Sequence, residues 1–219
     1  TNSNNNLKKQ QGNAALQTRD MKFASQYEVD TFIQSNLILC NVGNVSDLFN
    51  ISTKVSKRSR KQSYLTKHLP AIGSHMVTLT SSPWNFLHIS RVIYGLQHIS
   101  DDDVGVIDVL SAMTTVIDKM MKKSNMQSPK GQDISMLLYG LQNMSSEGEV
   151  MRRLILVVGQ MITQCGDTFA AQAVGNALYG LKEMSSECAE VRGVMSALAI
   201  KIRSCKQDLV GQAVGNALY

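Results

Sequence analysis

The octet QAVGNALY at Gln172–Tyr179 decides the fold of this chain, because the same eight letters return at Gln212–Tyr219. Related stretches read IYGLQHISDD from Ile93 and LYGLQNMSSE from Leu138. Their tyrosines, Tyr94, Tyr139, Tyr179 and Tyr219, are 45, 40 and 40 residues apart. A period of about 40 residues is typical of repeats built from two paired helices. The pattern therefore predicts an all-α fold, an α-solenoid of tandem helix–turn–helix repeats.

The first helix of each repeat is predicted to be amphipathic and to approach its neighbours closely. Around Tyr179 one helical face is formed by Val174, Ala177, Leu178 and Leu181. A small residue stands four positions before each tyrosine, as close packing of helices would need: Ser90, Ser135, Gly175 and Gly215. Residues with N-cap chemistry precede three of these helices at a common offset: Ser128, Thr168 and Asp208.

The second helix of each repeat is predicted to begin near the serines that follow the tyrosine: Ser100, Ser145 or Ser146, and Ser185 or Ser186. Ser146 and Glu149 fit a capping box, in which each side chain accepts from the other residue's backbone N–H. Broad apolar faces are expected from Val104, Ile107, Leu110, Val116, Ile117 and Met120, and from Val191, Val194, Met195, Leu198 and Ile202. A single helix pair cannot bury such a face, so the repeats must stack, and a right-handed superhelix with a concave groove is the expected product.

Three regions follow from this pattern and from the composition. Residues 1–25 are polar and are expected to form a disordered or extended leader. Residues 26–82 are expected to form degenerate N-terminal helical repeats. Their helices should cover 28–41 and 45–57, with a further helical piece over 63–79 that Pro70 interrupts or bends. Residues 83–219 hold the tandem repeats, and the last of these is expected to be truncated.

Basic charge is concentrated in the N-terminal part of the chain. The whole chain carries 22 Lys and Arg against 17 Asp and Glu, a net charge of +5. Residues 1–80 hold 10 and 4 of these, or +6, so residues 81–219, with 12 and 13, carry −1. The densest basic run holds Lys54, Lys57, Arg58, Arg60 and Lys61. Closely set basic side chains can bind the phosphates of a polyanion. The same run is compatible with a solvated loop between helices, a targeting signal or a docking surface.

Composition and motifs argue against several other classes of protein. The chain has 43% apolar residues but no uninterrupted apolar run of the roughly 18 residues that cross a bilayer. Its four cysteines form no CxxC pair and have no nearby histidine, so neither a metal site nor another cofactor is expected. The sequence has no phosphate-binding glycine loop, and its histidines show no pairing with a nucleophile and an acid. We therefore expect neither an enzyme nor a small-molecule substrate.

A surface stripe is predicted along the first helices, at positions seven and three before the tyrosine, at the tyrosine, and four after it. Its candidate binding residues are Arg91, Tyr94, His98, Gln132, Tyr139, Asn143, Gln172, Asn176, Tyr179, Gln212 and Asn216, and the pattern also includes Leu87, Met136, Glu183 and Tyr219. A tyrosine ring can stack on a base while a polar neighbour hydrogen-bonds the base edge, as in repeat proteins that read single-stranded RNA. The alternative interpretation is that the tyrosines pack between repeats and the polar residues only face water.

The residues LYGL followed by MSS, on paired helices at a period of 40, resemble the octatricopeptide, heptatricopeptide and pentatricopeptide families of helical-repeat proteins. The resemblance covers residues 83–219 well and residues 28–82 poorly. It implies a module that binds single-stranded RNA in organellar gene expression, in a mitochondrion or a plastid. The near-neutral repeats keep a second class open. This is a protein-docking scaffold or assembly subunit of a large organellar complex, such as a ribosome or a photosynthetic or respiratory assembly.

Overall fold

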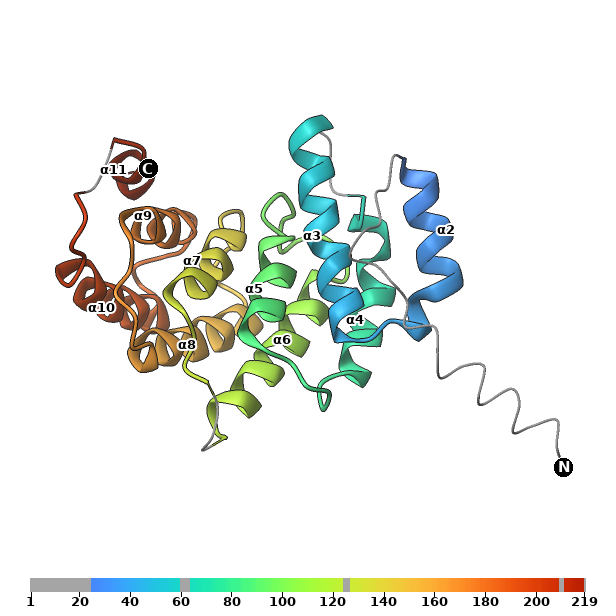
Figure 1. The fold of residues 1–219 in the computed structure, drawn as a ribbon, viewed down its shortest axis with the longest axis horizontal. Helices are drawn as coiled ribbons and strands as arrows, with labels where there is room; N and C mark the ends of the chain where they lie inside the picture. The colour runs from blue at the N-terminus through green and yellow to red at the C-terminus, as the bar shows by residue number, and fades with distance from the viewer. Residues whose placement is uncertain (1–24, 60–63, 124–126, 209–210, 219) are drawn as a thin grey trace, which may run out of the picture.

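The computed structural model describes residues 25–59, 64–123, 127–208 and 211–218, and every regular element in these ranges is helical (Figure 1). The α-helices are α2 (Gln26–Asn36), α3 (Val42–Ser59), α4 (Leu69–Thr78), α5 (Phe86–Tyr94), α6 (Val106–Met121), α7 (Gly131–Gly140), α8 (Glu149–Gln164), α9 (Ala171–Tyr179), α10 (Ala189–Arg203) and α11 (Gly211–Leu218). Two 3-10 helices, η1 (Leu37–Leu39) and η2 (Thr66–His68), precede α3 and α4. The prediction of an all-α fold is confirmed. Apart from Ser25, the predicted leader lies outside the described residues.

The helices stack in two rows that follow the order of the chain (Figure 1). In the first row, α3, α5, α7, α9 and α11 pack in succession, each against the next. In the second row, α4, α6, α8 and α10 do the same. Equivalent helices of neighbouring repeats therefore lie side by side, and the tyrosine-bearing helices α5, α7 and α9 are consecutive members of one row. None of the helices in the described ranges is long and apolar enough to cross a membrane.

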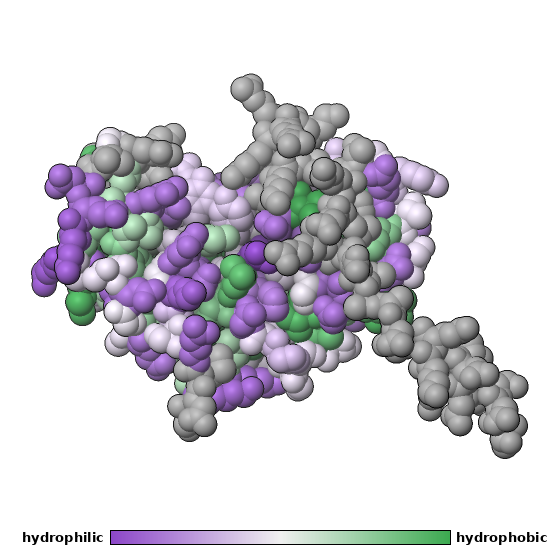
Figure 2. Space-filling model, in the orientation of Figure 1, coloured by the Kyte–Doolittle hydropathy of each residue, from purple (hydrophilic) through white to green (hydrophobic). Residues whose placement is uncertain are grey.

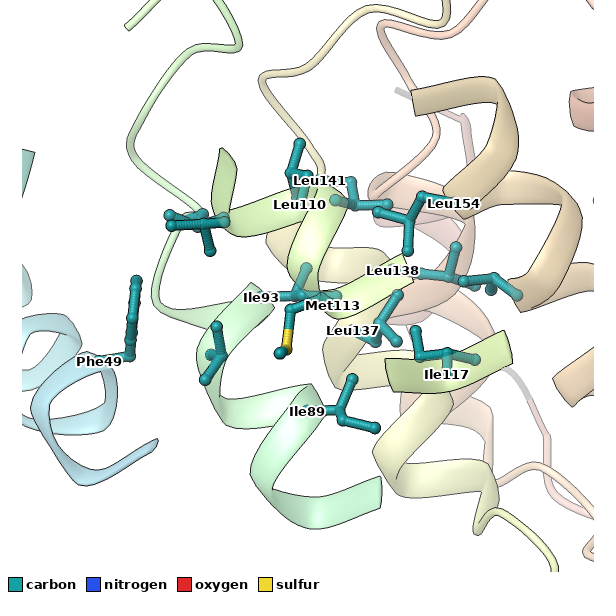
Figure 3. Packing of buried hydrophobic residues seen from close by; sticks show 14 of the residues in the cluster. Phe49, Ile89, Ile93, Leu110, Met113, Ile117, Leu137, Leu138, Leu141 and Leu154 are labelled. Atoms are coloured by element: carbon teal, nitrogen blue, oxygen red, sulfur yellow. The ribbon is translucent and has the colours of Figure 1, made fainter. Parts of the chain in front are cut away.

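Apolar side chains from both rows fill the space between them. Ile93 and Leu138 of the first row are 0% exposed, and so are Leu110, Met113 and Leu154 of the second (Figure 3). They belong to one hydrophobic cluster that runs from α2 to α10. Because each helix buries its apolar side against helices of neighbouring repeats, no repeat is covered by its own residues alone.

Three residues that the helical pattern placed on apolar faces lie at the surface instead. Val104 is 78% exposed, Ile107 41% and Met195 43%. Val104 precedes the start of α6, so it does not share that helix's inward face. Ile107 and Met195 lie beside buried stripes that are narrower than the sequence suggested. The other residues of those two predicted faces are buried or pack against the core. Figure 2 shows only small hydrophobic patches among hydrophilic residues on this side of the molecule.

The glycine after each tyrosine lets neighbouring first-row helices touch through their main chains. A Cβ atom at Gly140 would overlap the carbonyl oxygen of Ile93, and one at Gly180 would overlap the carbonyl oxygen of Leu138. Gly95 also approaches α3 closely, but there a Cβ would come within 2.7 Å of the Phe49 side chain and not of main-chain atoms. The glycine of the LYGL motif is therefore a contact residue of the stack.

The small residues four positions before the tyrosines also lie in the interior or at helix contacts in three repeats. Ser90 and Ser135 are buried. A Cβ at Gly175 in α9 would lie 2.8 Å from the Cα of Ala213 in α11. At Gly215 a Cβ would meet nothing within 4 Å. The expectation of close approach at these positions is thus met at Gly175, while Gly215 stands in open space.

Backbone donors at two helix starts are satisfied by the following repeat rather than by the predicted caps. The N–H of Gly131, the first residue of α7, donates to Asp167 Oδ2 at 3.2 Å. The N–H of Ala171, the first residue of α9, donates to Gln207 Oε1 at 3.0 Å. The N-caps predicted at Ser128 and Thr168 are wrong, because both helices begin three residues later than those positions. The helix α11 likewise begins at Gly211, three residues after Asp208.

The serines of the MSS motif link the repeats. The N–H of Ser145 donates to Asp101 Oδ2 at 3.0 Å, and the N–H of Ser185 donates to the hydroxyl of Ser146 at 2.9 Å. The predicted capping box of Ser146 and Glu149 is wrong, since α8 begins at Glu149 itself and the residue before it makes no side-chain cap. The second helices start later than predicted because the serines lie in the turn between the two helices of each repeat.

The N-terminal part keeps its predicted helices but shifts their boundaries. Helices were expected over 28–41 and 45–57, and α2 and α3 occupy this region with η1 between them. Pro70 lies in the first turn of α4 and does not interrupt it, since proline is pre-organised for a helix start. Asp30 ties α2 to η2. Its carboxylate accepts from Gln26 Nε2 at 2.6 Å and lies 2.5 Å from Lys67 Nζ and 2.6 Å from His68 Nε2.

Replacing Gly180 with alanine tests the main-chain contact. We expect Gly180→Ala to lower the free energy of unfolding by about 2–3 kcal/mol, because the methyl group overlaps the Leu138 carbonyl and the helices must move apart. The matched control is Gly193→Ala within α10, where a Cβ meets nothing within 4 Å. There, helix propensity favours alanine by up to about 1 kcal/mol. Urea unfolding followed by circular dichroism compares the two, and equal stability would contradict the close contact.

The Asp30 cluster should make stability depend on pH. The hydrogen bond from Lys67 is the largest effect on the pKa of Asp30 and, with those from Gln26 and His68, lowers it against the opposing effect of burial. A carboxyl group with a lowered folded-state pKa stabilises the fold above its unfolded pKa of about 3.9 and loses this contribution as the pH falls. We expect Asp30→Asn to be less stable than the native chain at pH 7, and the difference to shrink below about pH 4.

Urea unfolding at pH 7, 5 and 3 measures this difference. The exposed Asp208→Asn is the control, and we expect it to change stability little at any of these values. If the difference in the free energy of unfolding between Asp30→Asn and the native chain stays constant down to pH 3, the ionised carboxylate does not hold α2 in place.

Candidate functional site

Three tyrosines of the first row stack on one another. The ring centroids of Tyr94 and Tyr139 are 5.8 Å apart with an interplanar angle of 33°. Those of Tyr139 and Tyr179 are 5.6 Å apart at an angle of 25°. Each of the three side chains is half-buried. This set is the tyrosine ladder, and it shows the packing between repeats that was one of the two interpretations of these residues. Tyr219 lies outside the described residues.

The ladder depends on the glycine contacts between helices. Gly140 touches the main chain at Tyr94, and Gly180 touches the main chain at Tyr139. Rings one repeat apart therefore meet at separations within the range of about 4.5–7 Å that aromatic pairs prefer. Tyr139 has another tyrosine on either side. Ring contact between repeats therefore occupies part of the surface of Tyr139.

Three amide side chains of the predicted stripe lie on α7 and α9 without a hydrogen-bond partner in the described residues. Gln132 and Gln172 are exposed, and Asn176 is half-buried. Their side chains hydrogen-bond to no other group in the part of the chain that the structure describes. Gln132 and Gln172 hold equivalent positions on α7 and α9, seven residues before a tyrosine. This set of Gln132, Gln172 and Asn176 is the amide row, and each of its members can both donate and accept.

Two other polar residues of the stripe bind within the protein. Arg91 Nη1 lies 3.8 Å from Asp47 Oδ1, across the contact between α5 and α3. Asn143 Nδ2 donates to the backbone carbonyl of Gln97 at 2.9 Å and so joins two repeats. These two side chains are held in the stack by those contacts. A ligand would have to compete for them.

Positive charge beside the ladder is balanced locally. Lys182 Nζ lies 5.5 Å from the centroid of the Tyr179 ring and 2.7 Å from the carboxylate of Glu183. On α7, burial raises the pKa of Asp133 against the opposing charges of nearby basic groups, among them Arg91. Arg91 is thus close to Asp47 of α3, and its charge also acts on Asp133 of α7. Of the residues named here, the two cations along the ladder, Arg91 and Lys182, each have a carboxylate nearby.

The remaining predicted residues fall into three groups. Leu87, His98 and Glu183 are exposed and Met136 is half-buried, so these stripe positions reach the surface. Lys54, Lys57 and Arg58 lie in α3, and Gln212 and Asn216 lie in α11, but the structure describes none of these side chains. Arg60 and Lys61 lie outside the described residues.

Groups suited to metal or nucleophilic chemistry are not brought together in the described ranges. These residues hold no cluster of three His, Cys, Asp or Glu side chains able to bind a metal ion. All four cysteines are free thiols. Burial raises the pKa of Cys40 to about 11 and also raises that of Cys165, which keeps both thiols protonated and weakly nucleophilic at neutral pH. The ladder and the amide row can act by contact and hydrogen bonding.

The sequence did not reveal that Asn143 and Arg91 of the predicted stripe are held by contacts within the protein. The partners of Asn143 and Arg91, namely Gln97 and Asp47, lie about one repeat earlier in the chain. No local pattern signals either contact. The repeat register is the only signal that could have pointed to Gln97, because this residue and Asn143 both follow a ladder tyrosine by a few positions.

No family model matches this chain, and neither a curated protein nor a solved structure gives a match. The resemblance to organellar repeat families therefore stays a prediction. Function has to be inferred from the two rows of helices, the tyrosine ladder and the amide row.

A double-mutant cycle tests the ladder as an energetic unit. We expect Tyr139→Leu and Tyr179→Leu to be coupled by about 0.5–1.5 kcal/mol in the free energy of unfolding, as adjacent aromatic pairs are. The control cycle pairs Tyr94→Leu with Tyr179→Leu. These two rings have Tyr139 between them, so their coupling should be close to zero. Equal coupling in both cycles would mean that direct ring contact is not what joins the tyrosines.

Proposed function

We propose that this chain is a right-handed α-solenoid that docks a protein partner along the tyrosine ladder, as a scaffold or assembly subunit of a larger complex. One observation supports this most directly. Beside the ladder, the cations have nearby carboxylates, whereas the amides of Gln132, Gln172 and Asn176 have no partner within the described chain. The surface is therefore suited to an uncharged ligand that offers hydrogen-bond donors and acceptors.

Charge balance argues for protein over RNA at this surface. A polyanion gains affinity when Lys and Arg displace its counterions. Near the ladder, Arg91 is close to Asp47, and Lys182 is paired with Glu183. Binding phosphates here would require these pairs to break or would bring carboxylates near the phosphate oxygens. A neutral protein segment meets neither cost.

The aromatic content of the surface fits the same proposal. Tyrosine is enriched at protein–protein interfaces, where its ring supplies contact area at a small cost in conformational entropy. The ladder rings are half-buried and fixed by stacking, so little freedom remains for a partner to remove. Such pre-organisation favours affinity. The resemblance of the LYGL and MSS motifs to organellar helical-repeat families supports a place in a mitochondrial or plastid complex.

Selection from a peptide library tests the proposed function. We expect a display library of random sixteen-residue peptides to yield binders of the native chain. Their affinity should fall at least tenfold in the triple variant Gln132→Ala, Gln172→Ala and Asn176→Ala. The matched control, Gln34→Ala with Gln160→Ala, removes two exposed amides on α2 and α8, outside the row that carries the ladder, and should leave binding unchanged. Binders that do not distinguish the triple variant from the native chain would contradict the proposal.

Single-stranded RNA is the second candidate function, and the position of the basic run favours it. Lys54, Lys57 and Arg58 lie in α3, the first-row helix that packs against α5, where the ladder begins. If these three residues contact phosphates, the affinity for a pool of twenty-nucleotide RNAs should fall about twentyfold between 50 and 200 mM salt. Their replacement by alanine should remove that salt dependence. Binding of RNA that is sensitive to this replacement, without any peptide binder, would favour RNA over a protein partner.

A further inference from the structure

A groove of about 450 Å³ lies between α8 and α10 of the second row, away from the residues of the ladder and the amide row. Its lining includes Ile155 and Val194, whose side chains are 0% and 1% exposed. Leu156 also lines it and is 52% exposed, so a large apolar side chain is left in water there. Small-molecule sites in proteins are mostly apolar and enclose about 300–1,000 Å³. The groove has the size and the lining of such a site.

Two glycines keep the groove open. Gly159 of α8 and Gly193 of α10 both line it. A Cβ at Gly193 would meet nothing within 4 Å, and one at Gly159 would make only an ordinary contact of 3.4 Å with Val194. The packing of α8 against α10 therefore needs neither glycine. Because glycine within a helix is less stable than alanine by up to about 1 kcal/mol, these two positions cost stability, and the space that they leave belongs to the groove.

Glu190 of α10 is the charged residue among the described residues that line the groove. Its Oε2 accepts from the Cys188 thiol, with the sulfur 3.0 Å away. This hydrogen bond is the largest effect on the pKa of Glu190. Together with a backbone hydrogen bond and the charges of Arg152 and Arg192, it lowers that pKa against the opposing effect of burial. The groove therefore has an ionised carboxylate in its wall at neutral pH.

This carboxylate has no counter-ion of its own in the described ranges. Arg152 and Arg192 donate to backbone carbonyls in the turns before their own helices, and neither forms an ion pair with Glu190. A carboxylate accepts hydrogen bonds and donates none, so a group that binds it from the groove has to be a donor. A protonated amine makes the strongest bond of this kind, because both partners are charged.

We infer that the groove between α8 and α10 binds a small organic cation, an amine whose apolar body lies against Ile155, Leu156 and Val194 and whose ammonium group pairs with Glu190. The inference concerns a ligand site and no reaction. It is separate from the tyrosine ladder and does not rest on the proposed function. No sequence pattern indicated the site, because its walls belong to the second helices of two repeats.

Titration of the whole chain with phenylpropylamine tests the inference, and the uncharged phenylpropanol is the matched ligand. Isotope-labelled methyl groups of isoleucine, leucine and valine report binding by NMR. We expect the amine to shift the methyl signals of Ile155, Leu156 and Val194 and to bind about tenfold more tightly than the alcohol, as a hydrogen bond between charged groups implies. Glu190→Gln keeps an acceptor for the neighbouring thiol and should remove this preference.

A second variant separates the groove from the rest of the surface. Gly193→Leu fills the groove at a position where a Cβ meets nothing, so the chain should fold and the amine should bind at least tenfold more weakly. Ser196→Leu is the matched control. Ser196 is exposed on the same helix and does not line the groove, so its replacement should leave binding unchanged.

Each other result overturns a stated part of the inference. Methyl shifts that persist in Gly193→Leu would overturn the groove as the site. Equal affinity of the native chain for the amine and the alcohol would overturn the cationic chemistry. No methyl shift at millimolar amine would overturn the inference as a whole. All three results leave the peptide selection at the ladder untouched, so the proposed function is tested separately.

Discussion

Direct main-chain contact between equivalent helices is the constraint on which the rest of this structure depends. Where Gly140 and Gly180 meet the backbone of the preceding first-row helix, no side chain separates the two helices. This closeness brings tyrosine rings of successive repeats to 5.6–5.8 Å. It also accompanies the hydrogen bond from the Ser185 N–H to Ser146. The glycine contact, the aromatic stacking and the polar links between repeats therefore form one connected set of contacts, which we call the joint.

The joint also determines which side chains of the surface remain exposed. Tyr139 contacts a tyrosine ring in each adjacent repeat, so a base that stacks on it would have to compete with those contacts. Contacts between helices also hold the side chains of Arg91 and Asn143. What remains for a partner is a rigid aromatic edge with neutral amides beside it. This combination is the reason why the proposed ligand is a protein segment.

The sequence was sufficient for the all-α fold, because this follows from periodicity, which is a property of the chain itself. It was not sufficient for the helix starts. Ser128 and Ser146 have the right chemistry for local caps, but Ser128 bonds to the Gln164 carbonyl at the end of its own repeat, and Ser146 bonds to Ser185 of the next repeat. It was also not sufficient to predict which stripe residues bind within the protein, since Gln97 and Asp47 are distant in sequence from the residues they bind. Contacts between repeats decide these details, and a local pattern does not contain them.

The joint at Gly180 is made to the carbonyl of Leu138 and not to a side chain. A backbone carbonyl is present whatever residue occupies that position, so the fit places little demand on the neighbour's identity. Tandem duplication of a coding segment can therefore add a unit that fits against its own parent without compensating changes. The identical octets that include most of α9 and α11, in contact through Gly175 and Ala213, are what such copying would produce. Once copied, surface positions are free to diverge, and each new unit can acquire its own recognition chemistry.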